Sequence, residues 1–244
     1  MAGFYNGTRL YRHRWLRMGA AAGVAGPVAF TAAWVAGSLR QPGLPVTAAQ
    51  ISGLAAENAT NPWLMIGGFV ALGGCAVGFG AALAAGLGGY RSAGPGPALI
   101  QVAGVLAIAA GLLRRDHLLL TSGPESWHNH AHDVVSAASY VLLVAGPVLL
   151  AWRLRGYARW RPLAAPLAGA AVAAAGLLVA FYAGPQDSWD GTLQRIAVSL
   201  PLAAVAAVAV RLAQLAPAAP ADALRRQPTG RTADTDSADG VRSG

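Results

Sequence analysis

Charge is scarce in this sequence, and the charged residues that are present lie in short patches. Only 11% of the 244 residues are charged, whereas a soluble domain carries about a quarter. Hydrophobic residues make up 55% of the chain, and the mean hydropathy is +0.46. Between the charged patches lie apolar runs of about twenty residues, the length that crosses the hydrocarbon core of a bilayer. This composition predicts an integral membrane protein.

Cysteine and lysine are scarcer still. Cys75 is the only cysteine and lies in an apolar run, which excludes a disulfide framework and a thiolate metal cluster. All 18 basic residues are arginine, and the pI is about 10.7. The arginines flank the apolar runs and form no single basic face, so we expect no nucleic-acid partner. The sequence also contains no Walker loop, dinucleotide fingerprint, GxSxG elbow or HExxH helix, so these enzyme classes gain no support.

Six apolar runs predict an all-α polytopic bundle with about six membrane-spanning helices. The predicted spans cover residues 18–39, 63–89, 97–113, 131–152, 164–184 and 193–215. Residues 1–17 form a basic arm that resembles the start of a signal peptide. The apolar run that follows is longer than the apolar core of such a peptide, about 7–15 residues, so we interpret it as a span. Residues 216–244 lack the apolar content for a core, which predicts a disordered tail.

The arginines predict the orientation of this bundle. With six spans, fourteen of the 18 arginines fall on one side of the membrane, and the other side receives only Arg40, Arg114, Arg115 and Arg195. Because cytoplasmic loops carry the excess of basic residues, both termini are predicted to be cytoplasmic. Tryptophans near the predicted span ends fit interfacial aromatic belts: Trp15, Trp63, Trp127, Trp152, Trp160 and Trp189. We expect a multi-pass protein of a bacterial plasma membrane, in contact with the lipid bilayer.

Two local patterns predict where individual segments of the chain lie. Between the first two spans, Ile51, Leu54 and Ala55 recur at helical spacing, which predicts a short helix lying at the membrane surface. Within the second span, Gly74 and Gly78 have the spacing at which two helix backbones approach closely.

Carboxylates and imidazoles gather on the predicted extracytoplasmic side. Outside the tail, these residues are Glu57, Asp116, Glu125, Asp133, Asp187 and Asp190, with His117, His128, His130 and His132. At the mouth of a helix bundle such groups can bind a metal, relay protons or only contact water. Arg195 is close in sequence to two of the aspartates, which favours an ion pair, with anion binding as the alternative.

The densest polar segment covers residues 127–133, at the start of the fourth span. If it is helical, His128, His132 and Ser136 share one face at steps of four residues, so two imidazoles could hold a divalent metal such as zinc. Asp133 is a further candidate ligand. If the segment is extended, its three histidines share a side instead, and Asn129 is free to cap the helix. A solvated loop with ordinary capping is the third interpretation.

Three stretches carry a resemblance to a known family. They are Ile51 to Ala55 with the apolar entry at 63–69, Gly111 to Asp116 with His132 and Ser136, and Gly191 to Ile196. They are similar to the outer serine segment, the aspartate and histidine around helices three and four, and the glycine-to-arginine entry of helix six in a prokaryotic six-helix membrane family catalogued as domain of unknown function 998. That family typically has an acidic residue where Gly53 stands. The resemblance implies a six-helix membrane fold and no known reaction.

A more distant similarity is to membrane hydrolases of the alkaline ceramidase and adiponectin receptor type. In those proteins histidines, an aspartate and a serine assemble a zinc site among helices. The same residue types are present here as Ser52, Asp116, His128 and His132, although these histidines crowd into one segment.

The candidate site residues and functions follow from these patterns. A polar pocket is expected to contain Asp116, Ser136, Ser52 and Arg195, with His128, His132 and Asp133 as candidate metal ligands. One candidate function is a metal-dependent hydrolase of a lipid-like ester or amide, with a metal-bound water as nucleophile. A second is a proton-sensitive transporter or sensor, for which the spans supply few polar residues. A third is a purely structural partner protein.

Overall fold

The computed structural model of the chain describes residues 2–119, 124–184 and 189–216, with the backbone alone described for residues 2–12. Six long helices account for most of the described residues. They are α1 (Ala2–Leu39), α2 (Pro62–Gly86), α4 (Gly96–Leu112), α5 (Trp127–Leu154), α6 (Ala164–Ala183) and α7 (Asp190–Leu215). Three short helices lie between them: η1 (Ser52–Ala55), α3 (Tyr90–Ala93) and η2 (Arg161–Leu163). The described residues contain no strand, and the all-α prediction is confirmed.

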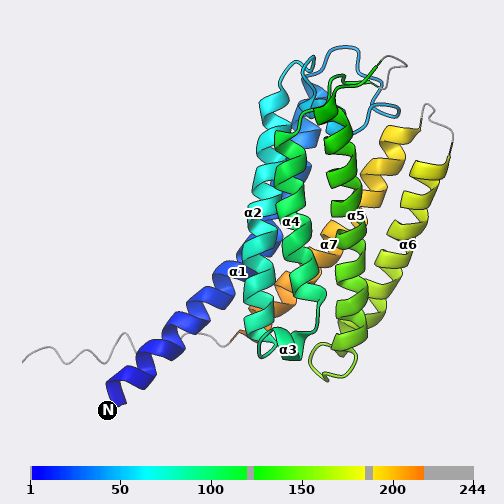
Figure 1. Cartoon of the computed structure of the whole chain (residues 1–244). Coiled ribbons are helices and arrows are strands. Elements are labelled where there is room, and N and C mark those ends of the chain that lie inside the picture. The colour runs from blue at the N-terminus through cyan, green and yellow to red at the C-terminus, as the bar shows by residue number, and fades with distance from the viewer. Residues whose placement is uncertain (1, 120–123, 185–188, 217–244) are drawn as a thin grey trace, which may run out of the picture.

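The long helices run up and down a single bundle (Figure 1). The connections before α2, α5 and α7 lie at one end, here called the η1 end, and α3 lies at the opposite end, the α3 end. Helices α2 and α4 pack between α1 and α5, while α6 stands at the edge of the bundle beside α5 and α7. Since the six long helices run alternately in opposite directions, α1 begins and α7 finishes toward the same end of the bundle.

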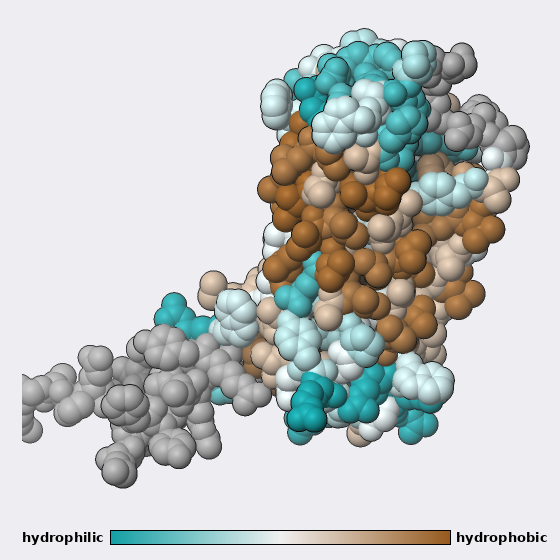
Figure 2. All heavy atoms as spheres, viewed as in Figure 1, coloured by the Kyte–Doolittle hydropathy of each residue, from teal (hydrophilic) through white to brown (hydrophobic). Residues whose placement is uncertain are grey.

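The surface of the bundle is that of a membrane protein. Figure 2 shows a broad apolar band between hydrophilic caps at the two ends. Five helices, all the long ones except α4, are long and apolar enough to cross a bilayer. Helix α4 has 17 residues, which gives a length of about 25 Å at a rise of 1.5 Å per residue. The membrane-spanning helices are thus confirmed, while crossing by α4, and with it the count of six, stays a prediction.

The helices start earlier than the hydropathy of the sequence predicts. Helix α1 extends back to Ala2 through the predicted basic arm, and α5 begins at Trp127 instead of residue 131. Helix α7 begins at Asp190, three residues before the predicted span. The apolar run marks where a helix is buried in lipid, whereas hydrogen bonding continues the helix into polar residues beyond it. The predicted tail lies outside the described residues from residue 217 onward.

The close approach of helices uses other glycines than the predicted pair. A Cβ atom at Gly74 or Gly78 would meet nothing within 4 Å, so this part of the prediction is wrong. The close contact lies instead between α2 and α4, where a Cβ at Gly73 would collide with the carbonyl oxygen of Gly104. The spacing of four residues therefore identified a helix rich in small residues but not the face that packs.

The short apolar helix between α1 and α2 is present, but its apolar side chains do not face the membrane. Ile51, Leu54 and Ala55 are at most 2% exposed and belong to the core of the bundle. A Cβ atom at Gly53 would collide with the carbonyl of Leu118, from the loop that follows α4. This close backbone approach accounts for glycine where the similar family typically has an acidic residue. The helix η1 is thus an inner wall of the η1 end.

The predicted aromatic belts are largely present. Tryptophans near the helix ends are at least 48% exposed: Trp15, Trp63, Trp127, Trp152 and Trp189. Trp160 differs, because it is 6% exposed and packs into the core, so its assignment to a belt is wrong.

Candidate functional site

A polar cavity of about 140 Å³ opens at the η1 end of the bundle. Its walls come from η1 and the loop before it, from the loop after α4, and from α5, α6 and α7. The lining residues are Gln50, Ser52, Arg115, His132, Asp133, Ser136, Tyr140, Phe181, Tyr182 and Gln194. Segments separated by more than a hundred residues therefore meet at one small volume.

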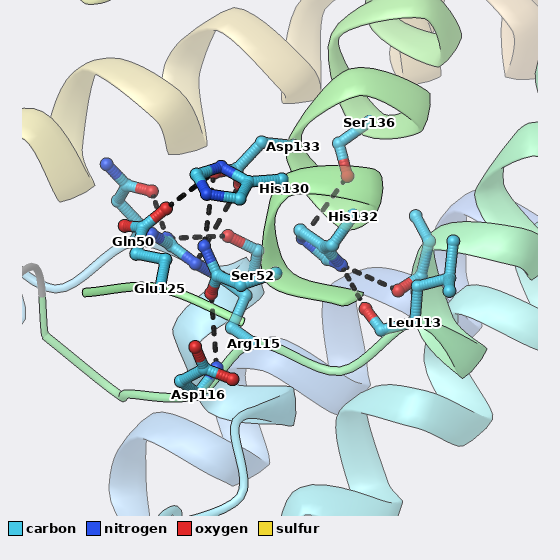
Figure 3. A network of polar contacts seen from close by, with 12 residues as sticks. Gln50, Ser52, Leu113, Arg115, Asp116, Glu125, His130, His132, Asp133 and Ser136 are labelled. Carbon is cyan, nitrogen blue, oxygen red and sulfur yellow. Dashed lines mark hydrogen bonds and ion pairs between the residues drawn. The ribbon is translucent and has the colours of Figure 1, made fainter. Parts of the chain in front are cut away.

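His132 and Ser136 form a hydrogen-bonded pair on the inner face of α5 (Figure 3). His132 is 1% exposed, and its Nδ1 lies 2.7 Å from the carbonyl oxygens of both Ala110 and Leu113 at the end of α4. Because a carbonyl can only accept, Nδ1 carries the proton. The Nε2 atom of the neutral ring is then an acceptor, and Ser136 Oγ donates to it over 3.2 Å. The tautomer is fixed by the backbone of the neighbouring helix.

Tyr140 extends the same face by one further turn. His132, Ser136 and Tyr140 are spaced by four residues, so their side chains stack along α5. Tyr140 is 8% exposed, and its hydroxyl, fully buried, makes no hydrogen bond within the described part of the chain. A buried hydroxyl without a partner is costly, so this group calls for an acceptor within the cavity.

Arg115 supplies the positive charge of the cavity. The side chain is 5% exposed, and its guanidinium donates from Nη1 to Gln50 Oε1 over 2.7 Å and to Ser52 Oγ over 3.5 Å. Its Nε lies 3.9 Å from Asp133 Oδ1, within ion-pair range but beyond hydrogen-bonding distance. This buried Nε donates no hydrogen bond to any described residue. Arg115 thus retains an unused donor beside a half-exposed carboxylate.

Asp116 is not among the residues that line the cavity, and its carboxylate braces the start of α5. Its carboxylate accepts from the hydroxyl of Ser126 over 2.6 Å and from the Ser126 amide over 2.7 Å. These two hydrogen bonds, the hydroxyl first, hold the pKa of Asp116 below its ordinary value, so the group is ionised at neutral pH. The Ser126 hydroxyl in turn accepts from the Asn129 amide, which makes Ser126 the N-cap of α5. Asn129 does not cap the helix itself.

His128 takes part in the same bracing network. Its Nδ1 lies 2.9 Å from the carbonyl oxygen of Arg114 and 3.5 Å from Asp116 Oδ1. The side chain therefore contacts the loop after α4 and is absent from the cavity lining. Although the segment is helical, as one of the predicted conformations required, His128 and His132 contact different groups.

Arg195 also lies outside the cavity. Its Nη1 donates to the carbonyl oxygens of Val46 and Ala49 over 2.8 and 2.7 Å, and its guanidinium carbon lies 5.3 Å from the centre of the Trp34 ring. The neighbouring Gln194 accepts from the Ile51 amide over 2.5 Å. The start of α7 therefore grips the backbone of the loop that carries Gln50 and Ser52. A predicted partner of Arg195, Asp187, lies outside the described residues.

Four of the seven predicted site residues line the cavity: Ser52, His132, Asp133 and Ser136. Asp116, His128 and Arg195 hold the surrounding segments instead. Of the predicted metal ligands, His132 is hydrogen-bonded through both ring nitrogens, and His128 Nδ1 lies beside the carbonyl oxygen of Arg114. No group of three or more His, Cys, Asp or Glu side chains positioned to hold a metal ion occurs among the described residues.

Several cavity residues escaped sequence reasoning: Gln50, Arg115, Tyr140, Phe181, Tyr182 and Gln194. Tyr140 could have been found, because it continues the step of four residues from His132 and Ser136. Arg115 was attributed to topology alone, and its position beside Asp116 in an irregular loop gave no sign of which side chain faces inward. Gln50 and the α6 residues carry no motif in the sequence, whereas Gln194 lies within the third stretch that resembles the family but was not singled out.

A comparison with known protein families shows to which family this chain belongs. The family model described as "Protein of unknown function (DUF998)" matches residues 24–211, which include every lining residue of the cavity. The chain belongs to the DUF998 family. No curated protein and no solved structure matches it.

The three stretches that resemble the family meet at the η1 end of this DUF998 protein. The first supplies Ser52 and the second Arg115, both lining the cavity together with His132 and Ser136. The third, at the start of α7, donates to the loop before η1 through Arg195, and Thr192 adds a backbone hydrogen bond to Thr47 over 2.9 Å. The resemblance thus coincides with one assembled region.

Proposed function

We propose that this DUF998 protein is a membrane-embedded hydrolase of lipid-like esters or amides, with Ser136 as nucleophile and His132 as general base. The observation that carries the proposal is the hydrogen bond from Ser136 Oγ to Nε2 of a histidine whose Nδ1 is held by two carbonyls. A serine, a base within hydrogen-bonding distance and a group that orients the base are the elements of an activated nucleophile.

The chemical step conserves atoms and protons within these residues, the substrate and water. As Ser136 Oγ bonds to the carbonyl carbon, its proton passes to His132 Nε2. The bond to the alcohol or amine then breaks, and the leaving group takes that proton from Nε2. A water molecule, deprotonated by the same nitrogen, attacks the acyl-serine. The bond to Ser136 Oγ breaks, the acid is released, and Nε2 returns the proton to Oγ. The carbonyls of Ala110 and Leu113 keep the Nδ1 proton in place throughout.

Two donors in the same cavity support this chemistry. The Tyr140 hydroxyl and the Arg115 Nε are buried and donate no hydrogen bond within the described residues. Both residues line the cavity with Ser136. A negative charge develops on the carbonyl oxygen during attack, and preorganised donors of this kind stabilise it. We propose that Tyr140 and Arg115 take this part, with Ser52 and Gln50 orienting the guanidinium.

The test is covalent labelling of the purified protein in lipid nanodiscs with an alkyl fluorophosphonate, followed by peptide mass spectrometry. We expect label on Ser136 and its loss in Ser136→Ala. Ser139→Ala is the matched control, because Ser139 is a buried serine on the same helix whose hydroxyl donates to the Ala103 carbonyl outside the cavity. Labelling that is equal in both variants, or absent from Ser136 in the folded wild type, would overturn the proposal.

No comparable observation supports either of the two alternative functions. The metal-dependent version needs converging ligands, which the described residues do not provide. A proton-sensitive transporter needs a polar path, yet the hollow beside the cavity is lined mainly by apolar groups such as Phe69 and Leu143. Gln101 lies toward the α3 end, where its amide donates to the Val77 carbonyl and its oxygen accepts from Tyr90.

We further propose that the η1 end is extracytoplasmic, that both termini are cytoplasmic, and that the protein resides in a bacterial plasma membrane. The use of Arg114, Arg115 and Arg195 as internal donors supports this, because these charges at the η1 end serve packing. Alkaline phosphatase fused after residue 119 should be active, and green fluorescent protein fused at the C-terminus should fluoresce. An inactive phosphatase fusion would contradict the orientation or the crossing by α4.

A further inference from the structure

A second hollow lies between α5 and α6, on the side of the polar cavity that is nearer the middle of the bundle. Its volume is about 420 Å³. The lining residues are Val141, Val144, Ala145, Ala175, Leu178, Val179 and Tyr182. Apart from the hydroxyl of Tyr182, these side chains offer only hydrocarbon. The hollow lies within the apolar band that faces the bilayer.

Tyr182 lines both the apolar hollow and the polar cavity. On α5, Ser136 lies one to three turns nearer the η1 end than Val141 and Ala145. On α6, Tyr182 lies near the η1 end, and Ala175 lies about 10 Å deeper, seven residues at 1.5 Å each. The two spaces therefore lie side by side and share Tyr182 as a wall, with polar groups toward the end of the bundle and hydrocarbon toward its middle. A lipid in the leaflet at the η1 end has the same arrangement, with its polar group toward the end of the bundle and its acyl chains toward the middle.

We infer that the hollow between α5 and α6 binds one long acyl chain of the substrate, whose ester or amide carbonyl then lies in the cavity at Ser136. The inference rests on the proposed function for the identity of the substrate, whereas binding of the chain rests on the hollow alone. The small side chains of Ala145 and Ala175 leave the space that the acyl chain fills. Arg115 matches the anionic acid that hydrolysis releases, since it is the cation of the cavity.

The inference predicts a preference for long-chain substrates. A short acyl group leaves the hollow unfilled, whereas each further methylene of a longer chain adds van der Waals contacts with its walls. Transfer from lipid to the hollow supplies no hydrophobic gain, because lipid tails are equally apolar. The chain length at which the gain stops is set by the depth of the hollow, because further methylenes extend into lipid.

The test is photo-crosslinking of a diazirine-bearing palmitic acid to the full-length protein in phosphatidylcholine nanodiscs, with crosslinks mapped by mass spectrometry. We expect crosslinks on residues 141–145 and 175–182. Ala175→Trp should fill the hollow and reduce these crosslinks by about tenfold or more. Ala173→Trp is the matched control, because Ala173 is an exposed alanine on the same helix and does not line the hollow.

All variants are also prepared with Ser136→Ala, so that chain binding is measured independently of the proposed nucleophile. Crosslinks in the hollow that persist in Ser136→Ala and disappear in Ala175→Trp support the acyl site, even if the fluorophosphonate fails to label Ser136. Crosslinks that are spread over the lipid-facing helices, with equal yields in Ala175→Trp and Ala173→Trp, overturn it. That result would leave labelling of Ser136 as an independent test of the hydrolase.

Discussion

Replacing His132 by glutamine is expected to slow acylation of Ser136 by about 10²- to 10⁴-fold, the range that a general base contributes. Glutamine can still donate from its amide to the carbonyls of Ala110 and Leu113, which His132 Nδ1 now contacts at 2.7 Å. It has no nitrogen that accepts the Ser136 proton. The substitution therefore removes the base while leaving a donor for the two buried carbonyls.

The measurement is the rate of fluorophosphonate labelling of Ser136, with the thermal unfolding midpoint recorded in the same nanodiscs. His130→Gln is the matched control, since His130 is on the same helix with a side chain 68% exposed and lies outside the cavity. An unchanged labelling rate in a folded His132→Gln protein would show that Ser136 needs no base. Slowing of equal size in His130→Gln would mean that the effect is not specific to the cavity.

Gly191→Ala is expected to lower the unfolding midpoint by several degrees, because overpacking of this kind costs about 1–3 kcal/mol. A Cβ atom there would collide with the carbonyl group of Ala49, in the loop that Arg195 holds. Neither partner can rotate away, since the obstacle is backbone. The displaced loop carries Gln50 and Ser52, so the labelling rate of Ser136 should fall as well.

Gly176→Ala is the control, and it is expected to raise the unfolding midpoint. Gly176 lies within α6, and a Cβ atom there would meet nothing within 4 Å. Alanine should therefore stabilise the helix by about 0.5–1 kcal/mol. Both variants are followed by intrinsic tryptophan fluorescence during heating in detergent. Equal shifts in Gly191→Ala and Gly176→Ala would contradict the close approach of α7 to the loop before η1.

The membrane fold and part of the site follow from periodicity in the sequence. Apolar runs of about twenty residues are a strong signal, and they locate all five long spans and the shorter α4 within a few residues. The step of four residues placed His132 and Ser136 on one face, and their hydrogen bond agrees with that expectation. Helical geometry fixes the direction of a side chain once the helix is known.

Irregular loops carry no such information, and there the residue-level predictions differ from the structure. Arg115 and Asp116 are adjacent in the loop after α4, yet only Arg115 lines the cavity. Asp116 lies beside Ser126 instead, which the sequence places ten residues away without any motif. Arg195 donates to carbonyls nearly 150 residues earlier, partners that the sequence did not indicate. A hydrogen bond to a backbone carbonyl does not depend on the residue type that carries the carbonyl, so the sequence does not indicate the partner.

Packing by glycine shows the same limit. Gly73 and Gly104 are in close contact, whereas Gly74 and Gly78 meet nothing within 4 Å. In a helix that contains many small residues, spacing alone does not distinguish the packed face from the lipid face. The position of α4 decides the face, and that position depends on the whole bundle.

The way in which arginines hold the loops at the η1 end has a consequence for how the sequence of this region can change in evolution. Arg195 binds the carbonyls of Val46 and Ala49, and Arg114 binds those of Ala55 and Ala56. Every amino acid presents a carbonyl, so the loop residues are constrained only by their size and path, whereas each arginine has no substitute with the same reach and donor geometry. Substitutions in such loops therefore cost little stability, and two proteins can keep this architecture while sharing only a few identical residues.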